Sequence, residues 1–285
     1  MSAQSQSLRR QRGSGALTVL MAAVCLAFLL PILIVLMNSF KGKFFISTMP
    51  FSFPSAADGT FVGLENYRAG VRLTGFFDAF GYSLFITVCS VGLIVLMTSM
   101  TGWFLARVNT KSMKLIYLLL VFSMVVPFQM VMFTMSKVAN ILKLDNPVGI
   151  VFVYLGYGAG LSTFMFTGFV RFVPREIEEA AHIDGCGPAR TFFSVVFPVL
   201  KPTAITVAIL NAMWIWNDYL LPYLLLGSKY KTIPIAVQYL RGGYGSVDMG
   251  AMMAILVLAI VPIVIFYLTC QKHIIKGVIA GAVKG

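Results

Sequence analysis

The residue types that most often carry enzyme chemistry are sparse and scattered in this chain of 285 residues. Its two histidines, His182 and His273, are far apart and belong to no HExxH-type array, and its four cysteines show no metal-ligand spacing. The pattern G-x-x-x-x-G-K-[ST] of a phosphate-binding loop is missing, because Gly42-Lys43 lacks the preceding glycine and is followed by phenylalanine. We therefore expect no catalytic residue, no metal site and no ATP hydrolysis by the chain itself.

One stretch, from Arg171 to Pro202, combines acidic residues, small residues and turn formers in the pattern of two short helices around a turn. Three glutamates between positions 176 and 179 suit the positive end of a helix dipole. Asp184-Gly185 supplies a stop, because glycine tolerates left-handed dihedral angles. Pro188 can then open a second helix.

The first of these two helices is expected to present a ridge of small side chains. Ile177, Ala180, Ala181 and Asp184 lie on one stripe at helical spacing, which a partner could approach closely. An isolated helix shorter than about 12 to 15 residues is marginal in water, so we expect a neighbour to hold it. The alternative is an interfacial helix on the membrane, which the acidic residues disfavour because the inner leaflet is negatively charged.

The same stretch follows the pattern E-A-A, three residues, Gly, nine residues, then I-x-L-P. The matching positions are Glu179, Ala180, Ala181, Gly185, Val195, Phe197 and Pro198, where Val195 and Phe197 replace Ile and Leu by other apolar residues. This pattern resembles the EAA loop of binding-protein-dependent ABC importer permeases, in particular their maltose-permease-like, carbohydrate branch. Softer resemblances to that branch are Asn38-Ser39-Phe40-Lys41, Leu64-Glu65-Asn66-Tyr67, the stretch 216–222 and the ending 281–285.

The resemblance implies a transport subunit, not an enzyme, with the ABC type I importer permease fold. It implies a heterodimer with a second related permease subunit, two cytoplasmic ABC ATPase subunits that bind ATP and Mg, and an extracytoplasmic solute-binding protein that delivers a sugar. The implied ATPase-coupling residues are Glu179, Ala180, Ala181, Asp184, Gly185 and Pro198. On this reading Gly185→Asp uncouples transport, because it spoils the turn and the docking surface.

Asp218 is the single charged residue inside a stretch otherwise apolar enough to cross a membrane, and two interpretations stay open for it. It could line a translocation path beside Trp216 and Tyr219, where aromatic faces and hydrogen-bonding groups suit a sugar. With its neighbours it could instead bond backbone groups freed at a kink.

Further pathway candidates are Phe128, Gln129, Asn211 and Trp214, although most aromatic residues in such helices serve packing. The glycine-rich residues around Arg241, Gly243 and Tyr244 resemble a segment that contacts a docked binding protein.

The secondary-structure elements that position these residues are expected to lie within the lipid bilayer. The composition is 59% hydrophobic and 11% charged, with a mean hydropathy of +0.88, which is too apolar for a soluble domain. The net charge of +12 comes from basic residues between long uncharged stretches, so we interpret them as topology signals and expect no nucleic-acid binding.

Six stretches reach the roughly 20 apolar residues that a spanning helix needs. They are Ala16 to Met37, Phe80 to Ala106, Leu115 to Ser136, Pro147 to Val170, Pro202 to Leu226 and Gly250 to Gln271. Backbone groups in hydrocarbon must bond within their own segment, and the alternating pattern of a barrel is missing. The fold class is therefore all-α, integral to the membrane. The first stretch could be a secretory signal, but its apolar run is too long and no A-x-A site follows, so we expect it to be retained.

The basic residues predict which side of the membrane holds the two termini. With an even number of crossings, thirteen of the 22 lysines and arginines lie on the side of the termini and nine on the other side. This bias places both termini in the cytoplasm, the protein in the inner or cytoplasmic membrane, and lipid around its helices. We expect a cytoplasmic tail (1–15), a first spanning helix (16–37), an extracytoplasmic loop (38–79), a permease core (80–271) with its coupling loop (171–201), and a cytoplasmic tail (272–285).

Three alternatives remain open on the sequence. An ABC permease for glycerol phosphate, amino acids or peptides would carry the same coupling loop, because that loop does not contact the solute. An ion-coupled secondary carrier would normally need several ionisable groups within the membrane. A membrane scaffold without transport activity is the third.

Overall fold

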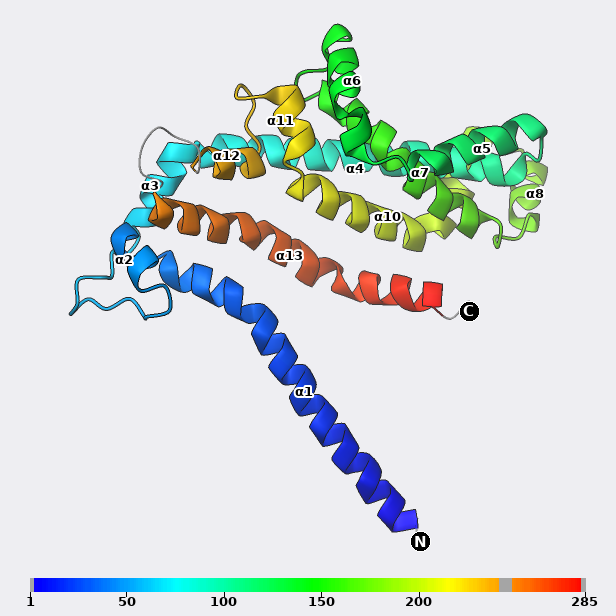
Figure 1. The fold of residues 1–285 in the computed structure, drawn as a ribbon. Coiled ribbons are helices and arrows are strands. Elements are labelled where there is room, and N and C mark those ends of the chain that lie inside the picture. Colours follow the sequence, from blue (N-terminus) through cyan, green and yellow to red (C-terminus); the bar gives the residue numbers. More distant parts are fainter. Residues whose placement is uncertain (1–2, 241–247, 283–285) are drawn as a thin grey trace. The chain divides into compact units, whose positions relative to one another are not determined.

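The computed structural model describes residues 3–240 and 248–282, and every regular element in these ranges is a helix (Figure 1). The elements are α1 (Ala3–Asn38), α2 (Lys43–Thr48), α3 (Glu65–Thr74), α4 (Phe76–Arg107), α5 (Lys111–Ser123), α6 (Phe128–Ile141), α7 (Gly149–Val170), α8 (Glu176–Ile183), α9 (Pro188–Thr191), the π-helical turn η1 (Phe192–Val196), α10 (Phe197–Asn217), α11 (Leu220–Leu226), α12 (Ile233–Tyr239) and α13 (Met249–Ala282). The all-α prediction is confirmed.

Among the described residues, five helical stretches are long and apolar enough to cross a membrane. They are Leu17–Asn38, Phe76–Arg107, Gly149–Val170, Pro188–Asn217 and Met249–Lys272. Each overlaps one of the predicted stretches. A sixth crossing is present only if the bent pair α5 and α6 counts as one span.

The predicted span from Leu115 to Ser136 is not one continuous helix. The chain breaks after Ser123, and α5 and α6 meet at an angle of 106°. The cause lies at Pro127, whose backbone is extended with φ −62° and ψ 136°. Proline lacks the N–H that would continue the helix, and it disfavours the helical conformation at the residue before it.

The predicted helix from Pro202 to Leu226 also differs from the observed one. It begins earlier, because α9, η1 and α10 form one continuous helical stretch from Pro188. It ends earlier too, at Asn217, since Asp218 adopts an extended conformation with ψ 124° before the short helix α11.

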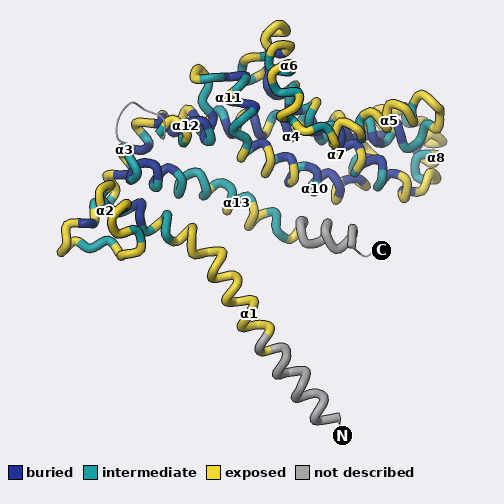
Figure 2. The backbone as a smooth tube through the Cα atoms, viewed as in Figure 1, coloured by how far each residue is buried: buried dark blue, intermediate teal, exposed yellow. Residues whose placement is uncertain are grey.

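The chain divides into two compact units, 1–76 with 237–261 and 77–236 with 262–285. In the first unit, polar side chains tie the segment after α1 into an ordered loop. Asn38 Nδ2 donates to the carbonyl of Pro50 at 2.9 Å, and the buried Lys41 Nζ donates to the carbonyls of Met49 (2.8 Å) and Ser52 (2.5 Å). The apolar length of α1 itself is exposed (Figure 2).

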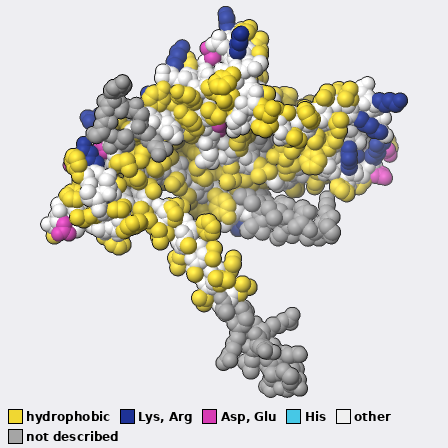
Figure 3. Space-filling view, viewed as in Figure 1, with side chains coloured by type: hydrophobic (Ala, Val, Ile, Leu, Met, Phe, Trp, Pro, Cys, Tyr) yellow, Lys and Arg dark blue, Asp and Glu magenta, His cyan; other side chains and the backbone are white. Residues whose placement is uncertain are grey.

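The core of the second unit lies between α4, α7 and α10. Its fully buried side chains include Ile94 on α4, Tyr154 and Phe166 on α7, and Leu200 on α10. Over the visible face of this unit, hydrophobic side chains cover the flanks of the helices, whereas lysines and arginines gather around the end formed by α5 and α8 and around the tip of α6 (Figure 3). An apolar flank beside a charged end is the distribution expected of helices that cross a bilayer.

Candidate functional site

The loop between α7 and α10 contains the eight-residue helix α8, which ends at Ile183, next to the predicted stop at Asp184-Gly185, but begins at Glu176, after Pro174, which we expect from the sequence in its first turn. Glu176, Glu178 and Glu179 occupy its first turn. At its end, the N–H of Cys186 donates to the carbonyl of Ala181 at 2.9 Å, and the N–H of Gly185 donates to that of His182 at 3.0 Å. This pair of bonds is the Schellman motif, and it requires the left-handed conformation that Gly185 adopts with φ 78°.

One carboxylate attaches α8 to the end of α4. Oε1 of Glu178 accepts from Arg107 Nε (2.9 Å) and Nη2 (2.6 Å), and Oε2 accepts from Trp103 Nε1 at 3.0 Å. Arg107 Nη2 also donates to the carbonyl of Val173 at 2.9 Å. The side chains of Arg107 and Glu178 are 15% and 12% exposed, so the ion pair is largely screened from water.

Sequence reasoning missed this attachment. The sequence indicates Glu178 only as an acidic residue at a helix N-terminus, and nothing in it pairs this residue with Trp103 or Arg107. The partners lie 71 and 75 residues from Glu178, and no local pattern relates them.

The two faces of α8 have different surroundings, so the predicted single ridge is in fact divided. Ala181 is 5% exposed and Ile177 is half-buried, on the face that also carries Glu178. Ala180 and Asp184 are exposed on the surface instead. The division arises because a helix held by a neighbour through one face must bury the apolar residues of that face.

The outer surface of α8 contains most of the predicted coupling residues. Glu179, Ala180, Asp184 and Gly185 are exposed there, whereas Pro198 lies in the first turn of α10. Ile183 is 87% exposed beside them and was missed as a site residue. A large apolar side chain exposed on a short helix outside the spanning segments is the signal that could have identified it.

The segment after α8 differs from the predicted second short helix. Pro188 opens a helix as expected, but that helix continues through the π-helical turn η1 into the span. Phe192, at the start of η1, is buried, and its ring centroid lies 5.6 Å from that of Trp103. Trp103 therefore contacts the loop at two points, through Glu178 and through Phe192.

The pathway candidates divide into two groups, of which the first contacts residues of α7. The Tyr154 hydroxyl donates to Asp218 Oδ2 at 3.0 Å, and its ring meets Trp214 edge-on with centroids 5.5 Å apart. Asn211 is buried and donates to Ser162 Oγ at 3.1 Å. Asp218 Oδ1 also accepts from the backbone N–H of Leu220 at 3.1 Å, as a helix cap does.

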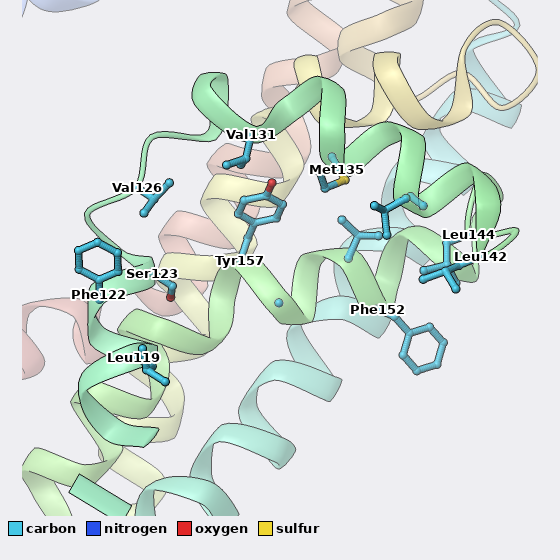
Figure 4. A pocket seen from close by; sticks show the side chains of 14 residues that line it. Leu119, Phe122, Ser123, Val126, Val131, Met135, Leu142, Leu144, Phe152 and Tyr157 are labelled. Atoms are coloured by element: carbon cyan, nitrogen blue, oxygen red, sulfur yellow. The ribbon is translucent and has the colours of Figure 1, made fainter. Parts of the chain in front are cut away.

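The second group lies beside a cavity of about 490 Å³ between α5, α6 and α7. The ring of Phe128 packs edge-on against Tyr157, which lines this cavity, with centroids 5.4 Å apart, whereas Gln129 is exposed. Figure 4 shows apolar side chains such as Leu119 and Val131 around it, and the hydroxyls of Ser123 and Tyr157 are the polar side-chain groups of its lining. Two hydroxyls are too few to satisfy the many hydroxyls of a sugar.

Two remaining predictions concern the binding protein and metal ions. Arg241, Gly243 and Tyr244, predicted to contact a binding protein, lie outside the described residues. Among the residues that the structure does describe, no group of three His, Cys, Asp or Glu side chains could hold a metal ion.

Comparison with known sequences identifies relatives over nearly the whole chain. Residues 98–280 match the sequence model of the family described as binding-protein-dependent transport system inner membrane component. The probable starch degradation products transport system permease protein AmyC of Thermoanaerobacterium thermosulfurigenes is 38% identical, over 94% of this chain and 96% of that protein. The multiple sugar-binding transport system permease protein MsmG of Streptococcus mutans is 34% identical (93% and 95%).

Two further comparisons extend this result. The melibiose/raffinose/stachyose import permease protein MelC of Bacillus subtilis is 31% identical, over 97% of this chain and 99% of that protein. Among solved structures, a chain of a bacterial ABC transporter involved in the import of the acidic polysaccharide alginate superimposes with a TM-score of 0.78. It covers 93% of this chain and 97% of its own length at 21% identity, which shows a shared fold.

Proposed function

The chain belongs to the family of binding-protein-dependent transport system inner membrane components, as a permease subunit of an ABC importer, and from this membership we propose that it imports sugars or oligosaccharides. The support for a sugar comes from three relatives, AmyC, MsmG and MelC, whose names specify starch products, multiple sugars and melibiose, raffinose and stachyose. Each is at least 31% identical over at least 93% of this chain.

The observation that carries the proposed mechanism is the free outer face of α8. Glu179, Ala180 and Ile183 are exposed there, while the opposite face is held by the second unit. Small side chains around one large apolar residue suit insertion into a groove. We propose that this face docks on a cytoplasmic ABC ATPase subunit, which binds ATP and Mg, and that a pair of such ATPases rocks the spanning helices between inward-open and outward-open states.

The charge distribution supports a cytoplasmic position for α8. Lys111 and Lys114 at the start of α5, and Arg171 and Arg175 before α8, are basic residues near the ends of spanning helices. Such residues are enriched on the cytoplasmic side of membrane proteins. Both termini would then be cytoplasmic.

The low polarity of the cavity supports a translocation path for the sugar that is lined by two permease subunits. The cavity between α5, α6 and α7 offers only the hydroxyls of Ser123 and Tyr157. A second related permease would supply the missing hydrogen-bonding groups, and the exposed side chains of Trp214 and Gln129 are the proposed contribution of this chain. An extracytoplasmic solute-binding protein would deliver the sugar to that path, with Arg241, Gly243 and Tyr244 as its proposed contacts.

Uptake by the reconstituted complex tests the proposal. Proteoliposomes that hold this chain, the second permease, the ATPase pair and the binding protein are supplied with radiolabelled maltose, raffinose, glycerol phosphate and an oligopeptide. We expect ATP-dependent accumulation of a saccharide only. Accumulation of glycerol phosphate or peptide would overturn the sugar assignment, and accumulation driven by an ion gradient without ATP would overturn the importer mechanism.

A photoreactive side chain at position 183 tests the docking face in the same complex. We expect Ile183 replaced by benzoylphenylalanine to crosslink to the ATPase subunit. The matched control places the same group at Ser112, which is exposed in the first turn of α5 and outside the loop. Crosslinks from Ser112 alone, or from neither position, would contradict the proposed docking.

A further inference from the structure

The loop that contains α8 is covalently continuous with α7 and α10, but its strongest side-chain attachment is to α4. Arg107 is the last residue of α4, a helix of 32 residues, and it lies 71 residues from Glu178. A displacement of α8 would reach α7 and α10 through the chain itself. It can reach α4 only through non-covalent contacts.

The contact has the geometry needed to transmit a displacement. Both oxygens of Glu178 are engaged, by the guanidinium of Arg107 and by the indole N–H of Trp103. Because Arg107 binds Oε1 through two nitrogens and Trp103 binds Oε2, the orientation of the carboxylate is fixed, and charge-assisted bonds such as those to Arg107 are the strong ones. Their low exposure, 15% and 12%, reduces the screening that makes surface ion pairs weak.

Two further contacts hold the loop against the end of α4. The carbonyl of Val173, in the turn before α8, accepts from Arg107 Nη2, so Arg107 holds the loop both before and within the helix. The ring of Trp103 packs against Phe192 in the π-helical turn after the loop. The end of α4 therefore contacts the loop before, within and after α8.

We propose that the contact of Glu178 with Arg107 and Trp103, here called the joint, makes α4 move with α8 when the ATPase moves α8. This inference rests on the proposed docking of the outer face of α8. Glu178 faces inward and acts as a positioning residue, not as a contact of the ATPase. When α8 shifts, the fixed carboxylate pulls the end of α4, and a helix long enough to cross the membrane carries the motion to its other end.

The measurement that tests this role is the amount of solute transported per ATP hydrolysed by the full complex in proteoliposomes. Glu178→Gln removes the ion pair but keeps the size of the side chain. We expect a fall of about fivefold or more, the lower end of typical coupling between sites, with unchanged ATPase content and melting temperature of the complex. The matched control is Glu176→Gln, which removes the same charge from an exposed position in the same turn and is expected to leave the ratio unchanged.

An exchange of the charges of Arg107 and Glu178 distinguishes a joint from a contact that serves stability alone, because it can restore the amount of solute transported per ATP hydrolysed. We expect Arg107→Glu and Glu178→Arg each to lower the ratio, and the double variant to regain a substantial part of it. Trp103→Phe keeps the packing on Phe192 but lacks the N–H, and we expect it to give an intermediate ratio, which supplies a readout even if the charge variants fold poorly.

Two outcomes overturn the joint. A normal ratio in Glu178→Gln would show that α8 moves the bundle without this contact. If a lowered melting temperature accounts for the whole loss of solute transported per ATP, and the double variant does not regain this ratio, the contact has a role in folding only. Failure of the wild-type complex to transport at all would instead reject the proposed function, so the two failures are distinguishable.

Discussion

The hydroxyl of Tyr154 donates a hydrogen bond of 3.0 Å to Oδ2 of Asp218, which ties the end of α10 to the first half of α7. The other oxygen of Asp218 accepts from the N–H of Leu220 at the start of α11. These bonds satisfy backbone and side-chain groups at the break between the two helices. They favour the structural interpretation of Asp218, and the pathway interpretation stays a prediction.

Substitution of Asp218 distinguishes these interpretations. Asp218→Ala loses both bonds, and we expect it to destabilise the protein by about 1 kcal/mol, as the loss of a helix cap does. Asp218→Asn keeps an acceptor for Leu220, and we expect near-normal sugar uptake and a smaller fall in melting temperature in detergent. A strong loss of uptake in Asp218→Asn at normal melting temperature would favour the pathway role.

The turn after α8 predicts an order of effects at Gly185. A Cβ at this position would meet no atom within 4 Å. The effect of a substitution therefore depends on whether the new residue tolerates the left-handed backbone and on the charge of its side chain. Asn and Asp both tolerate this conformation, whereas a β-branched residue does not. We expect Gly185→Asn to keep transport, Gly185→Asp to lose it through its charge on the docking face, and Gly185→Val to lose it through the turn. Equal uptake by the Asn and Asp variants would contradict docking at this turn.

The exposed side chain of Ile183 predicts a loss of ATPase binding. Ile183→Asp places a charge where the proposed docking buries an apolar group, and we expect at least about tenfold weaker retention of the ATPase, equivalent to about 1.4 kcal/mol. Ser112→Asp adds the same charge elsewhere at the proposed cytoplasmic surface. Co-purification of the ATPase with each variant measures the difference, and equal retention by both would argue against this docking face.

The buried ammonium of Lys41 predicts a stability effect in the loop after α1. Lys41→Met removes the charge-assisted hydrogen bonds to the carbonyls of Met49 and Ser52, and a hydrogen bond to a charged group contributes about 1.5 to 3 kcal/mol. We expect a lower melting temperature in detergent. Lys43→Met removes the same charge from an exposed side chain two residues away and serves as the control. A melting temperature of Lys41→Met equal to that of the control would refute the role of Lys41.

The stability contributed by Lys41 is expected to depend on pH. Burial lowers the pKa of its amino group below 10.5. Between the lowered pKa and 10.5 the unfolded chain binds more protons than the folded protein, so the stability of the folded state rises with pH over this interval. We expect the difference in melting temperature between the wild type and Lys41→Met to increase as the pH approaches 10.5. A difference independent of pH would contradict the lowered pKa.

The two departures from the predicted spans have a common physical origin. Hydropathy measures how apolar a stretch is, and it is insensitive to a break within an apolar stretch. Pro127 and Asp218 lie in such stretches, and the backbone is extended at each of them, so that α6 begins only after Pro127 and α10 ends before Asp218. Proline was a local signal for the first break, whereas the second depends on a bond to Tyr154, a residue 64 positions away.

Local properties of the chain, read without a structure, determined that it crosses the membrane as helices, that a short helix stops at Asp184-Gly185, and that this helix belongs to an EAA-like loop. Apolar length, turn residues and a motif in contiguous residues suffice for such inferences. Only the tertiary structure decided which face of α8 is free and that Glu178 binds Arg107 and Trp103. These contacts depend on the path of the chain between α4 and α8, and no pattern within a window of neighbouring residues encodes that path.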